Sequence, residues 1–257
     1  MSEKGLSAIV IARDEEDRIE SCLRSVLRAD ERIVIVDAAT RDATADRARP
    51  LATDLVILPW EGFAAARTFA IDRARGPWIL WIDADEEADQ ELMDAALRVA
   101  SETQDRLGFY VRRRNWYFGR LIRHGTWGSE MVPRLFRKDS ARLDDRLVHE
   151  SVRIEGAMGR LPGHLEHRSY RSLSHHWEKM GVWVGLWAEQ ALREGKRARG
   201  TDILLRPPLR FIKGYLLKAG FLDGIAGLVL AFMDAVYVGA KYARLLELQG
   251  RQRHKEV

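Results

Sequence analysis

The sequence predicts an α/β fold built on a mostly parallel sheet, and three observations indicate it. Over the first hundred residues, short apolar runs alternate with amphipathic segments, which is typical of βαβ units. The chain has 257 residues, of which 46% are hydrophobic and 31% charged, so it can bury a large core. From about residue 172 onward, apolar positions recur with helical spacing. We therefore expect a sheet flanked by helices, followed by a helical C-terminal extension.

The first hundred residues contain four candidate strands and three candidate helices. Apolar runs predict strands over residues 6–12, 32–37, 54–59 and 78–83. Helical spacing of apolar residues covers Ile19 to Leu27, Phe63 to Ala74 and about 89 to 100. Asp14 is of a residue type that caps helices, so we expect it to begin the first one.

The rest of the chain differs in character. From about residue 108 the segments are shorter and rich in arginine and aromatic residues, which we interpret as strands and loops. Residues 172–194 predict a long helix, and the Arg-Pro-Pro sequence at 206–208 predicts a break. The uncharged stretch Gly224 to Met233 is shorter than the roughly 20 residues of a membrane-spanning helix. We expect instead an in-plane amphipathic helical pair with these residues at lipid headgroups: Arg210, Lys213, Lys218, Lys241 and Arg244.

The composition excludes some sites and favours one class of ligand. Cys22 is the single cysteine, which excludes an intramolecular disulfide and a cysteine-built zinc site. The first ten residues lack the apolar core of a signal peptide, so we expect a cytoplasmic protein. The net charge is only +4, but basic residues cluster in the middle of the chain and near its end. Such clusters suit nucleotides, an anionic membrane surface or nucleic acid; nucleic acid is least favoured because no nucleic-acid-binding motif is present.

Acidic residues follow the predicted strands at the edge where open α/β sheets bind ligands. Asp37 follows the second strand, and Asp83 and Asp85 follow the fourth. Two carboxylates spaced one residue apart can hold a divalent cation, which can in turn bind a diphosphate. The alternative is that the acids from Asp83 to Glu87 only cap and solvate the next helix. The position at the end of a buried strand favours the metal site.

Several longer segments follow one another in a specific order along the chain. They are IVIARDEE, IVDAATRDAT, EGFAAARTFAIDRARGPWILWIDADEE and RLVHES. Together they resemble the motifs of family 2 glycosyltransferases with the GT-A fold, which is a Rossmann-like fold. More narrowly, NWYFG, RLFRKDSARL and GFLDGIAGLVLAF resemble bacterial enzymes that add glucose or a related sugar to the lipopolysaccharide inner core. The resemblance runs from about residue 5 to about residue 247.

This resemblance implies a donor pocket for a nucleotide sugar and a divalent cation, Mg²⁺ or Mn²⁺. The residues it assigns to the donor are Ala12, Arg13, Glu15, Asp37, Arg67 and Asp83. Asp37 would bind the uracil or ribose, and Arg67 would approach the diphosphate. Asp85 would bind the metal directly, while Asp83 would lie near the ribose or a metal-bound water. The family usually has Arg-Asn where this chain has Arg67-Thr68.

The resemblance also implies a general base that deprotonates the acceptor hydroxyl. Glu150 is our choice for this base, with His149 as a metal-side or hydrogen-bonding partner. Adjacent residues of an extended segment face opposite ways, so only one of the two can readily point into the cleft. Asp144 and Asp145 are the alternatives.

Acceptor contacts are expected around residues 123–130. Trp127 offers a flat face that suits a sugar ring, and a core position is its alternative. Related enzymes usually have an aspartate near the position of Glu130. The arginines that could bind phosphates or acidic sugars are Arg112 to Arg114, Arg120 and Arg123. His164 and His167 could cap a rim loop or contact the acceptor.

We therefore expect a metal-dependent inverting glycosyltransferase that moves a sugar to a lipopolysaccharide-core or related glycolipid acceptor. Glucose from a UDP-sugar is the expected donor group. Residues 1–170 would form the catalytic domain, with a nucleotide-sugar half (1–105) and an acceptor half (106–170). Residues 171–257 would form a helical, membrane-associating region that holds the protein peripherally at the inner face of the cytoplasmic membrane. The alternatives are a polyprenyl-phosphate sugar transferase of the same fold and a non-catalytic membrane-associated binding protein.

Overall fold

The described part of the chain forms two compact units. The computed structural model describes residues 5–60, 62–102, 104–128, 130–143 and 152–255. Within these ranges, the first unit comprises residues 5–114, 130–143 and 152–168, and the second comprises 115–128 and 169–255. We predicted a boundary at residue 170; the second unit also includes the segment 115–128.

A mixed sheet forms the centre of the first unit. Its strands are β1 (Leu6–Ala12), β2 (Glu31–Asp37), β3 (Asp54–Leu58), β4 (Trp78–Asp83), β5 (Glu86–Ala88), β6 (Gly108–Tyr117), β8 (Glu130–Arg137) and β11 (Met158–His167). The end of β6 and the short strand β7 (Arg120–Leu121) belong to the second unit. In the described chain the strands of the sheet follow the order β3-β2-β1-β4-β8-β6-β11-β5, with β7 paired to β6. The first four are parallel, whereas β8 is antiparallel to β4 and β6. The short strands β9 (Ala141–Leu143) and β10 (Val152–Ile154) pair with each other, and the 3₁₀ turn η1 (Lys138–Ser140) precedes β9.

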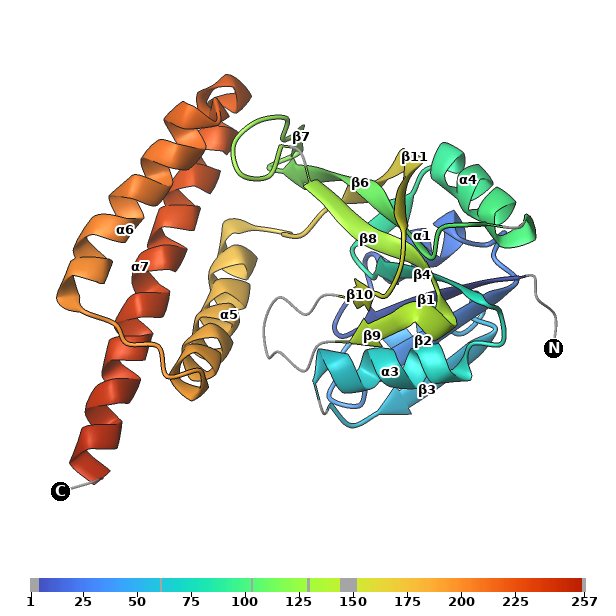
Figure 1. Ribbon diagram of the computed structural model, residues 1–257, viewed down its shortest axis with the longest axis horizontal. Coiled ribbons are helices and arrows are strands. Elements are labelled where there is room, and N and C mark those ends of the chain that lie inside the picture. The colour runs from blue at the N-terminus through green and yellow to red at the C-terminus, as the bar shows by residue number, and fades with distance from the viewer. Residues whose placement is uncertain (1–4, 61, 103, 129, 144–151, 256–257) are drawn as a thin grey trace. The chain divides into compact units, whose positions relative to one another are not determined.

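Helices cover both faces of this sheet because successive strand residues point to opposite sides. On one face, α1 (Ile19–Ser25), α2 (Thr44–Ala48) and α4 (Gln90–Ser101) pack on side chains such as Ala8 and Val10. On the other face, α3 (Phe63–Arg73) packs on side chains such as Ile9 and Trp81. Figure 1 shows α3 on one side of the strands and α4 on the other. The two-sided burial accounts for the nearly continuous apolar runs of β1, β2 and β4.

The predicted strands and helices of the first hundred residues are confirmed, but one cap is wrong. Helix α1 begins at Ile19, and Arg18 occupies the position before it. Asp14 instead has a positive φ of 53° and accepts the backbone N–H of Arg41 at 2.8 Å. Aspartate tolerates this left-handed conformation in a loop. Asp14 therefore holds the loop after β2 and does not begin a helix.

The second unit is mostly helical. It contains α5 (Leu173–Arg193), α6 (Gly200–Ile212), the π-helical turn η2 (Lys213–Leu217), the 3₁₀ turn η3 (Gly220–Asp223) and α7 (Gly224–Lys255). The predicted break at residues 206–208 is wrong, because Pro207 and Pro208 lie inside α6. The Pro207 ring lies against α7 at Gly239, where a Cβ would approach its Cγ to 3.3 Å. Packing on α7 thus retains a helix that proline would otherwise interrupt.

Two apolar clusters hold the second unit together. Tyr117, Ile122 and Leu230 are buried in the first, and Ala188 and Leu245 in the second. By length and composition alone, the stretch Gly220–Gln252 is long and apolar enough to cross a membrane, and it is the one such helix in the described ranges. Of its apolar window, 39% is buried inside the protein. We predicted that the uncharged stretch 224–233, bounded by Asp223 and Asp234, is too short to cross a membrane. The helical stretch found in the structure is longer because it includes Asp234.

Candidate active site

The carboxyl ends of β2, β1 and β4 lie side by side at one edge of the sheet. These strands are parallel neighbours, with Ala12 opposite Val36 and Ile11 opposite Asp83. The residues that follow each strand therefore emerge at the same edge. This register brings the predicted donor residues Arg13, Asp37 and Asp83 to one place.

The β1 and β2 side of this edge carries a buried carboxylate. Asp37 is buried, and its Oδ1 accepts the backbone N–H of Ala39 at 2.8 Å. The Nη1 of Arg13 lies 3.1 Å from the other oxygen, Oδ2, and half of the Arg13 side chain is exposed. Ala12 and Glu15 are also buried, and the backbone N–H of Glu15 donates to Thr44 at 2.8 Å. Asp37 is thus oriented by its own turn, with an arginine beside it.

At the end of β4, three arginines surround two carboxylates; we call these five residues the arginine cluster. The cluster comprises Arg67, Arg113, Arg134, Asp83 and Glu86. Arg113 Nη2 lies 2.6 Å from Glu86 and 3.3 Å from Asp83. Arg134 donates to Asp83 and, at 2.8 Å, to Glu86. Arg67 Nη2 lies 3.7 Å from Asp83.

Neighbouring groups position the cluster. Arg67, on α3, lies over the ring of Trp81, with its guanidinium carbon 3.7 Å from the ring centroid. The indole N–H of Trp81 donates to Asp83 Oδ1 at 3.0 Å. Glu86 is fully buried, and its Oε2 accepts the backbone N–H of Asp83 at 3.0 Å. Packing on an aromatic face and bonding to backbone both hold charged groups at fixed positions.

The electrostatics of the cluster keep Asp83 and Arg113 ionised. Burial opposes the ionisation of Asp83, but the positive charges of Arg134, Arg67 and Arg113 outweigh it and hold the pKa of Asp83 well below its ordinary range. Burial also opposes the charge of Arg113, yet Glu86 and Asp83 raise the pKa of Arg113. The Asp83 side chain remains 32% exposed, so a ligand can reach the cluster. Glu130, outside the cluster, also lies 3.5 Å from Arg113, so the three arginines are closely matched by acidic side chains.

A second pair of groups lies next to the cluster. Asp85 is in the turn between β4 and β5, and His167 ends β11. Asp85 Oδ1 and His167 Nε2 are 3.7 Å apart. Burial lowers the pKa of His167, which favours the neutral imidazole, the form that binds metals. With metal–ligand bonds of about 2.1 Å, two ligands of one ion lie about 3 to 4 Å apart, so the pair fits a divalent cation.

This pair cannot complete a metal site by itself. Within the described ranges, no three histidine, cysteine or acidic side chains are grouped so that they could hold a metal ion. Mg²⁺ commonly uses one or two protein ligands and takes the rest from substrate phosphates and water. Asp83, which we predicted as a second metal ligand, lies among the arginines.

Comparisons with known proteins agree with this geometry. Residues 7–157 match the family model described as Glycosyl transferase family 2, which covers more than half of the chain. The chain belongs to this family. It is 29% identical over 254 residues to the lipopolysaccharide core biosynthesis glycosyltransferase LpsC of Rhizobium meliloti (strain 1021), covering 93% of each chain. It is 26% identical over 262 residues to an uncharacterized glycosyltransferase of Rickettsia typhi, covering 98% of this chain and 90% of that one.

A solved structure confirms the predicted fold. The mannosyltransferase PcManGT from Pyrobaculum calidifontis, in complex with GDP-Man and Mn²⁺, is similar with a TM-score of 0.51 at 16% identity. The match covers 96% of this chain and 88% of that chain. The protein is therefore a family 2 glycosyltransferase with the GT-A fold.

The remaining predicted site residues of this family 2 enzyme are distributed over the chain. Glu150, His149, Asp144 and Asp145 lie outside the described residues, so the choice of base stays a prediction. Glu130 belongs to the first unit, and its Oε1 lies 3.5 Å from Arg113 of the arginine cluster.

Trp127 and Arg123, predicted for the acceptor, belong to the second unit. The half-buried Trp127 ring packs in the first apolar cluster of that unit and stacks on Tyr170 with centroids 5.9 Å apart. The side chain of Arg123 is exposed, and its backbone N–H donates to Asp223 at 3.1 Å. Asp223 also accepts the backbone N–H of His124 at 2.7 Å, so it fixes the loop that carries both residues.

Four residues of the site were not predicted in these roles. We considered Glu86 only for the start of the next helix, His167 for a rim loop or the acceptor, and Arg113 for the phosphates or acidic sugars of the acceptor. Arg134 was only one of a group of basic residues. The approach of Arg113 and Arg134 depends on β8 pairing with β4 and with β6. The sequence could have indicated a buried role for Arg134, because this charged residue lies inside the apolar run of β8.

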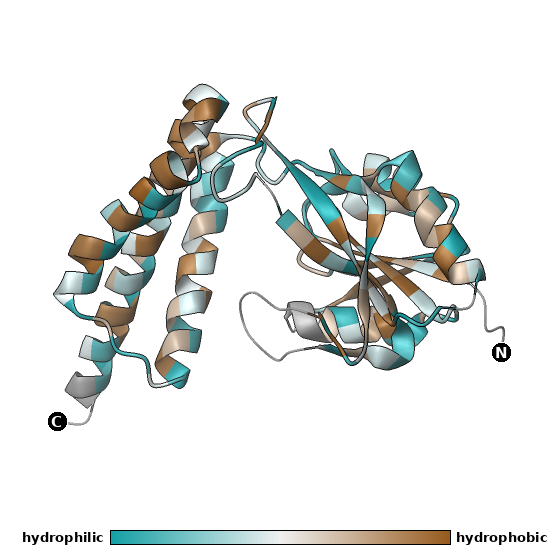
Figure 2. Ribbon diagram, turned by 45° about the horizontal axis from the view of Figure 1, so that its top comes forward, coloured by the Kyte–Doolittle hydropathy of each residue, from teal (hydrophilic) through white to brown (hydrophobic). Residues whose placement is uncertain are grey.

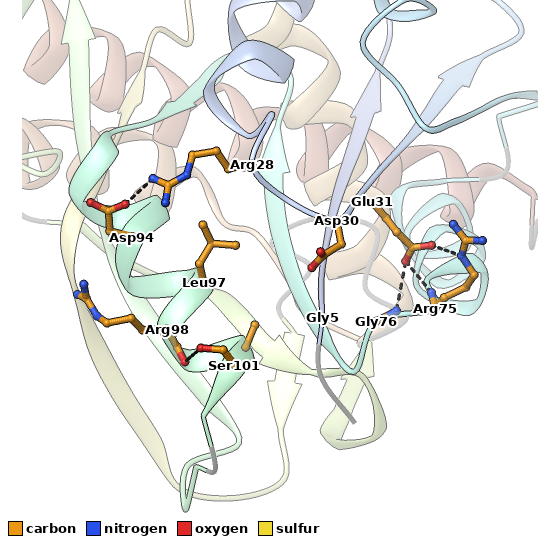
Figure 3. Close-up of a pocket in the computed structure, with 11 residues that line it drawn as sticks. Gly5, Arg28, Asp30, Glu31, Arg75, Gly76, Asp94, Leu97, Arg98 and Ser101 are labelled. Atoms are coloured by element: carbon orange, nitrogen blue, oxygen red, sulfur yellow. Dashed lines mark hydrogen bonds and ion pairs between the residues drawn. The ribbon is translucent and has the colours of Figure 1, made fainter. Parts of the chain in front are cut away.

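An open cavity of about 1100 Å³ lies elsewhere in the first unit (Figure 3). It is lined by residues before β1, β2 and β4 and by α4, including Gly5, Asp30 and Gly76. Its charged side chains largely pair with one another, because Arg28 pairs with Asp94 and Arg75 with Glu31. None of the predicted site residues lines it.

Proposed function

We propose that this family 2 enzyme transfers a hexose from a nucleotide-sugar donor to a lipopolysaccharide-core or related glycolipid acceptor. The observation that carries the proposal is the arginine cluster at the strand ends, beside the facing pair Asp85 and His167. Arginine side chains next to a potential cation site suit the diphosphate of a donor. The similarity to LpsC over 93% of both chains supports the acceptor class.

The donor nucleoside would bind at the β1 and β2 side of the edge. Asp37 would accept hydrogen bonds from the base or ribose, and its buried oxygen Oδ2 lies beside Arg13. Ala12 and Glu15 would line the same pocket. UDP is our choice of nucleotide, and glucose our choice of sugar, on the resemblance described above.

The diphosphate would bind at the arginine cluster. The side chains of Arg67 and Arg113 are 12% and 14% exposed, and Asp83 pairs with both. Each guanidinium could donate to phosphate oxygens. Asp85 and His167 would hold a Mg²⁺ or Mn²⁺ ion. When bound, such an ion stabilises negative charge on the leaving diphosphate oxygen as a Lewis acid.

The transfer itself needs a base on the acceptor side. Glu150 would take the proton from the acceptor hydroxyl as that oxygen bonds to the anomeric carbon and the bond to the diphosphate breaks. A single displacement of this kind inverts the anomeric configuration and forms no sugar-enzyme bond. His149 would orient Glu150 or the metal side of the site, and Glu130, Trp127 and Arg123 would contact the acceptor.

A glycolipid acceptor places the enzyme at a membrane. We propose that it is peripherally associated with the inner face of the cytoplasmic membrane through its helical region. Exposed apolar residues on α6 and the start of α7 support this location.

A transfer assay tests the proposal. Purified enzyme is incubated with Mn²⁺, a panel of UDP-, GDP- and TDP-sugars, and either lipopolysaccharide core or polyprenyl phosphate. We expect labelled sugar in the core oligosaccharide from one UDP-sugar, and loss of that product with EDTA. Label in the lipid phosphate would instead identify a polyprenyl-phosphate sugar transferase. Absence of both hydrolysis and transfer with every donor would contradict the enzyme assignment.

A further inference from the structure

The apolar residues of helix α6 are exposed to solvent, whereas a helix that only packs on the core would bury them. None of its residues is buried. Leu204 is 72% exposed and Leu209 63%, and Leu205 and Ile212 are exposed as well. Residues 205, 209, 212 and 216 recur at the spacing of one helical face, which continues through η2. The apolar stripe of α6 therefore points to solvent.

The half-buried residues of α6, which include Ile203, Pro207 and Phe211, lie on the opposite side of the helix from this stripe. Gly214 of η2 is buried, and a Cβ at its position would lie 3.9 Å from the Cβ of Ala231 on α7. Pro207 packs at Gly239 on the same helix. Close approach at Gly239 and Gly214 therefore brings the opposite side of α6 and η2 against α7, while the leucines stay exposed.

The stripe continues onto the next elements. Leu217 is 78% exposed in η2, and Ile225 is 77% exposed at the start of α7. Phe221, Leu228 and Phe232 are also exposed, at helical spacing from Ile225. Figure 2 shows hydrophobic residues recurring along α6 and α7. We call the set of exposed apolar residues from Leu204 to Phe232 the outward face.

The charges around the outward face are mostly positive. Residues 199–223 contain five basic and two acidic side chains. Of the two acids, Asp223 is buried, and Asp202 accepts from Arg206 at 2.6 Å. Lys213 and Lys218 are exposed beside the apolar stripe. Two other residues that we expected at lipid headgroups contact the protein instead. Arg210 donates to Asp234 at 2.9 Å, and Lys241 lies 4.5 Å from the Trp187 ring centroid.

We propose that the second unit docks on an anionic lipid bilayer through the outward face, with Leu217 and Ile225 inserted and Lys213 and Lys218 at the headgroups. An apolar stripe flanked by lysines is the pattern of helices that lie in the membrane interface. A second copy of the chain fits less well, because a twofold interface would place the same positive face against itself. This inference rests on the membrane association proposed above and is independent of the transfer reaction.

Fluorescent labelling of the full chain tests the insertion. Cys22 is completely buried, and burial raises the pKa of its thiol, so a new surface cysteine can be labelled selectively. Leu217→Cys carries an environment-sensitive dye, and Val182→Cys on α5, 62% exposed, is the matched control. Vesicles containing phosphatidylglycerol should shift the Leu217→Cys dye emission to the blue and leave the Val182→Cys dye unchanged. No shift at Leu217→Cys, or equal shifts at both, would overturn the proposal.

Vesicle flotation separates the apolar and charged contributions. Leu209→Ser/Leu217→Ser/Ile225→Ser should weaken binding by roughly tenfold or more, whereas Val182→Ser should bind like the wild type. Lys213→Glu/Lys218→Glu should lose the preference for phosphatidylglycerol over phosphatidylcholine. UDP should still raise the melting temperature of each variant, because the donor site is untouched, so failure to dock is distinguished from failure of the enzyme. The proposal would be contradicted if the triple variant bound vesicles as tightly as the wild type. It would also be contradicted if the wild type were a dimer and the triple variant a monomer with unchanged vesicle binding.

Discussion

The two units of the molecule depart from the usual distribution of residues in opposite ways. The first unit buries charge, since Glu86 and Arg134 lie inside it at the end of a sheet. The second unit exposes apolar surface, since none of the residues of α6 is buried. Both arrangements cost free energy in an isolated soluble protein. We propose that a ligand completes each surface: an anion at the arginine cluster and a lipid layer at the outward face.

Glu86→Gln should produce the largest loss of stability, because it removes a buried carboxylate that pairs with both Arg113 and Arg134. Breaking a buried ion pair from one side costs about 3 to 5 kcal/mol. The matched control is Asp94→Asn, which breaks the exposed pair with Arg28 and should cost under about 1 kcal/mol. Urea unfolding measures both. Equal losses of unfolding free energy in the two variants would show that the buried ion pairs of Glu86 contribute no more than the exposed pair of Asp94.

Two leucines of the second unit, one buried and one exposed, show how far stability depends on burial in that unit. Leu245 is completely buried, and Leu245→Ala should cost about 2 to 5 kcal/mol. Leu209 lies on the outward face, and Leu209→Ala should change stability by less than about 0.5 kcal/mol. Thermal or urea unfolding without lipid checks this pair. A large loss for Leu209→Ala would mean that α6 packs its leucines in the protein.

The stability of the second unit should fall at mildly acid pH because of His176. Burial, and secondarily the nearby His175, lower the pKa of His176 to about 4, and Nδ1 of its ring lies 2.9 Å from the hydroxyl oxygen of Tyr117. The unfolded chain binds this proton near pH 6.5, so the contribution is fully present above that pH and is lost as pH falls toward 4. The loss should approach about 2 to 3 kcal/mol.

His176→Gln removes the titrating group and provides the control. Its free energy of unfolding should change less between pH 7 and 5 than that of the wild type, as measured by urea unfolding at each pH. Identical pH dependence in the two proteins would show that His176 is not the responsible group.

The parallel half of the sheet could be predicted from sequence because its strands are buried on both faces. Leu6–Ala12 and Trp78–Asp83 are apolar runs with sharp ends, so their bounds and the position of Asp83 followed directly. Asp14 and the two prolines of α6 did not follow local rules. Their conformations depend on a loop contact with Arg41 and on packing against α7, which local propensity does not report.

The candidate site could be predicted only where its residues follow the parallel strands. Asp37 and Asp83 come to one edge by the rule for open sheets. Arg113 and Arg134 reach Asp83 from 30 and 51 residues away, through antiparallel pairing. His167 approaches Asp85 because β11 pairs with β5, a three-residue strand that we had assigned to a helix start. Such pairings depend on the whole fold.

The central claim is that a donor diphosphate binds at the strand ends with help from an ion held by Asp85 and His167. Calorimetric titration of UDP, with and without Mn²⁺, tests it most directly in the wild type, Asp85→Asn and the control Asp94→Asn. We predict that Mn²⁺ tightens UDP binding by roughly tenfold or more in the wild type and in Asp94→Asn, and that Asp85→Asn loses this gain. An equal gain in Asp85→Asn, or no effect of Mn²⁺ on the wild type, would contradict the account.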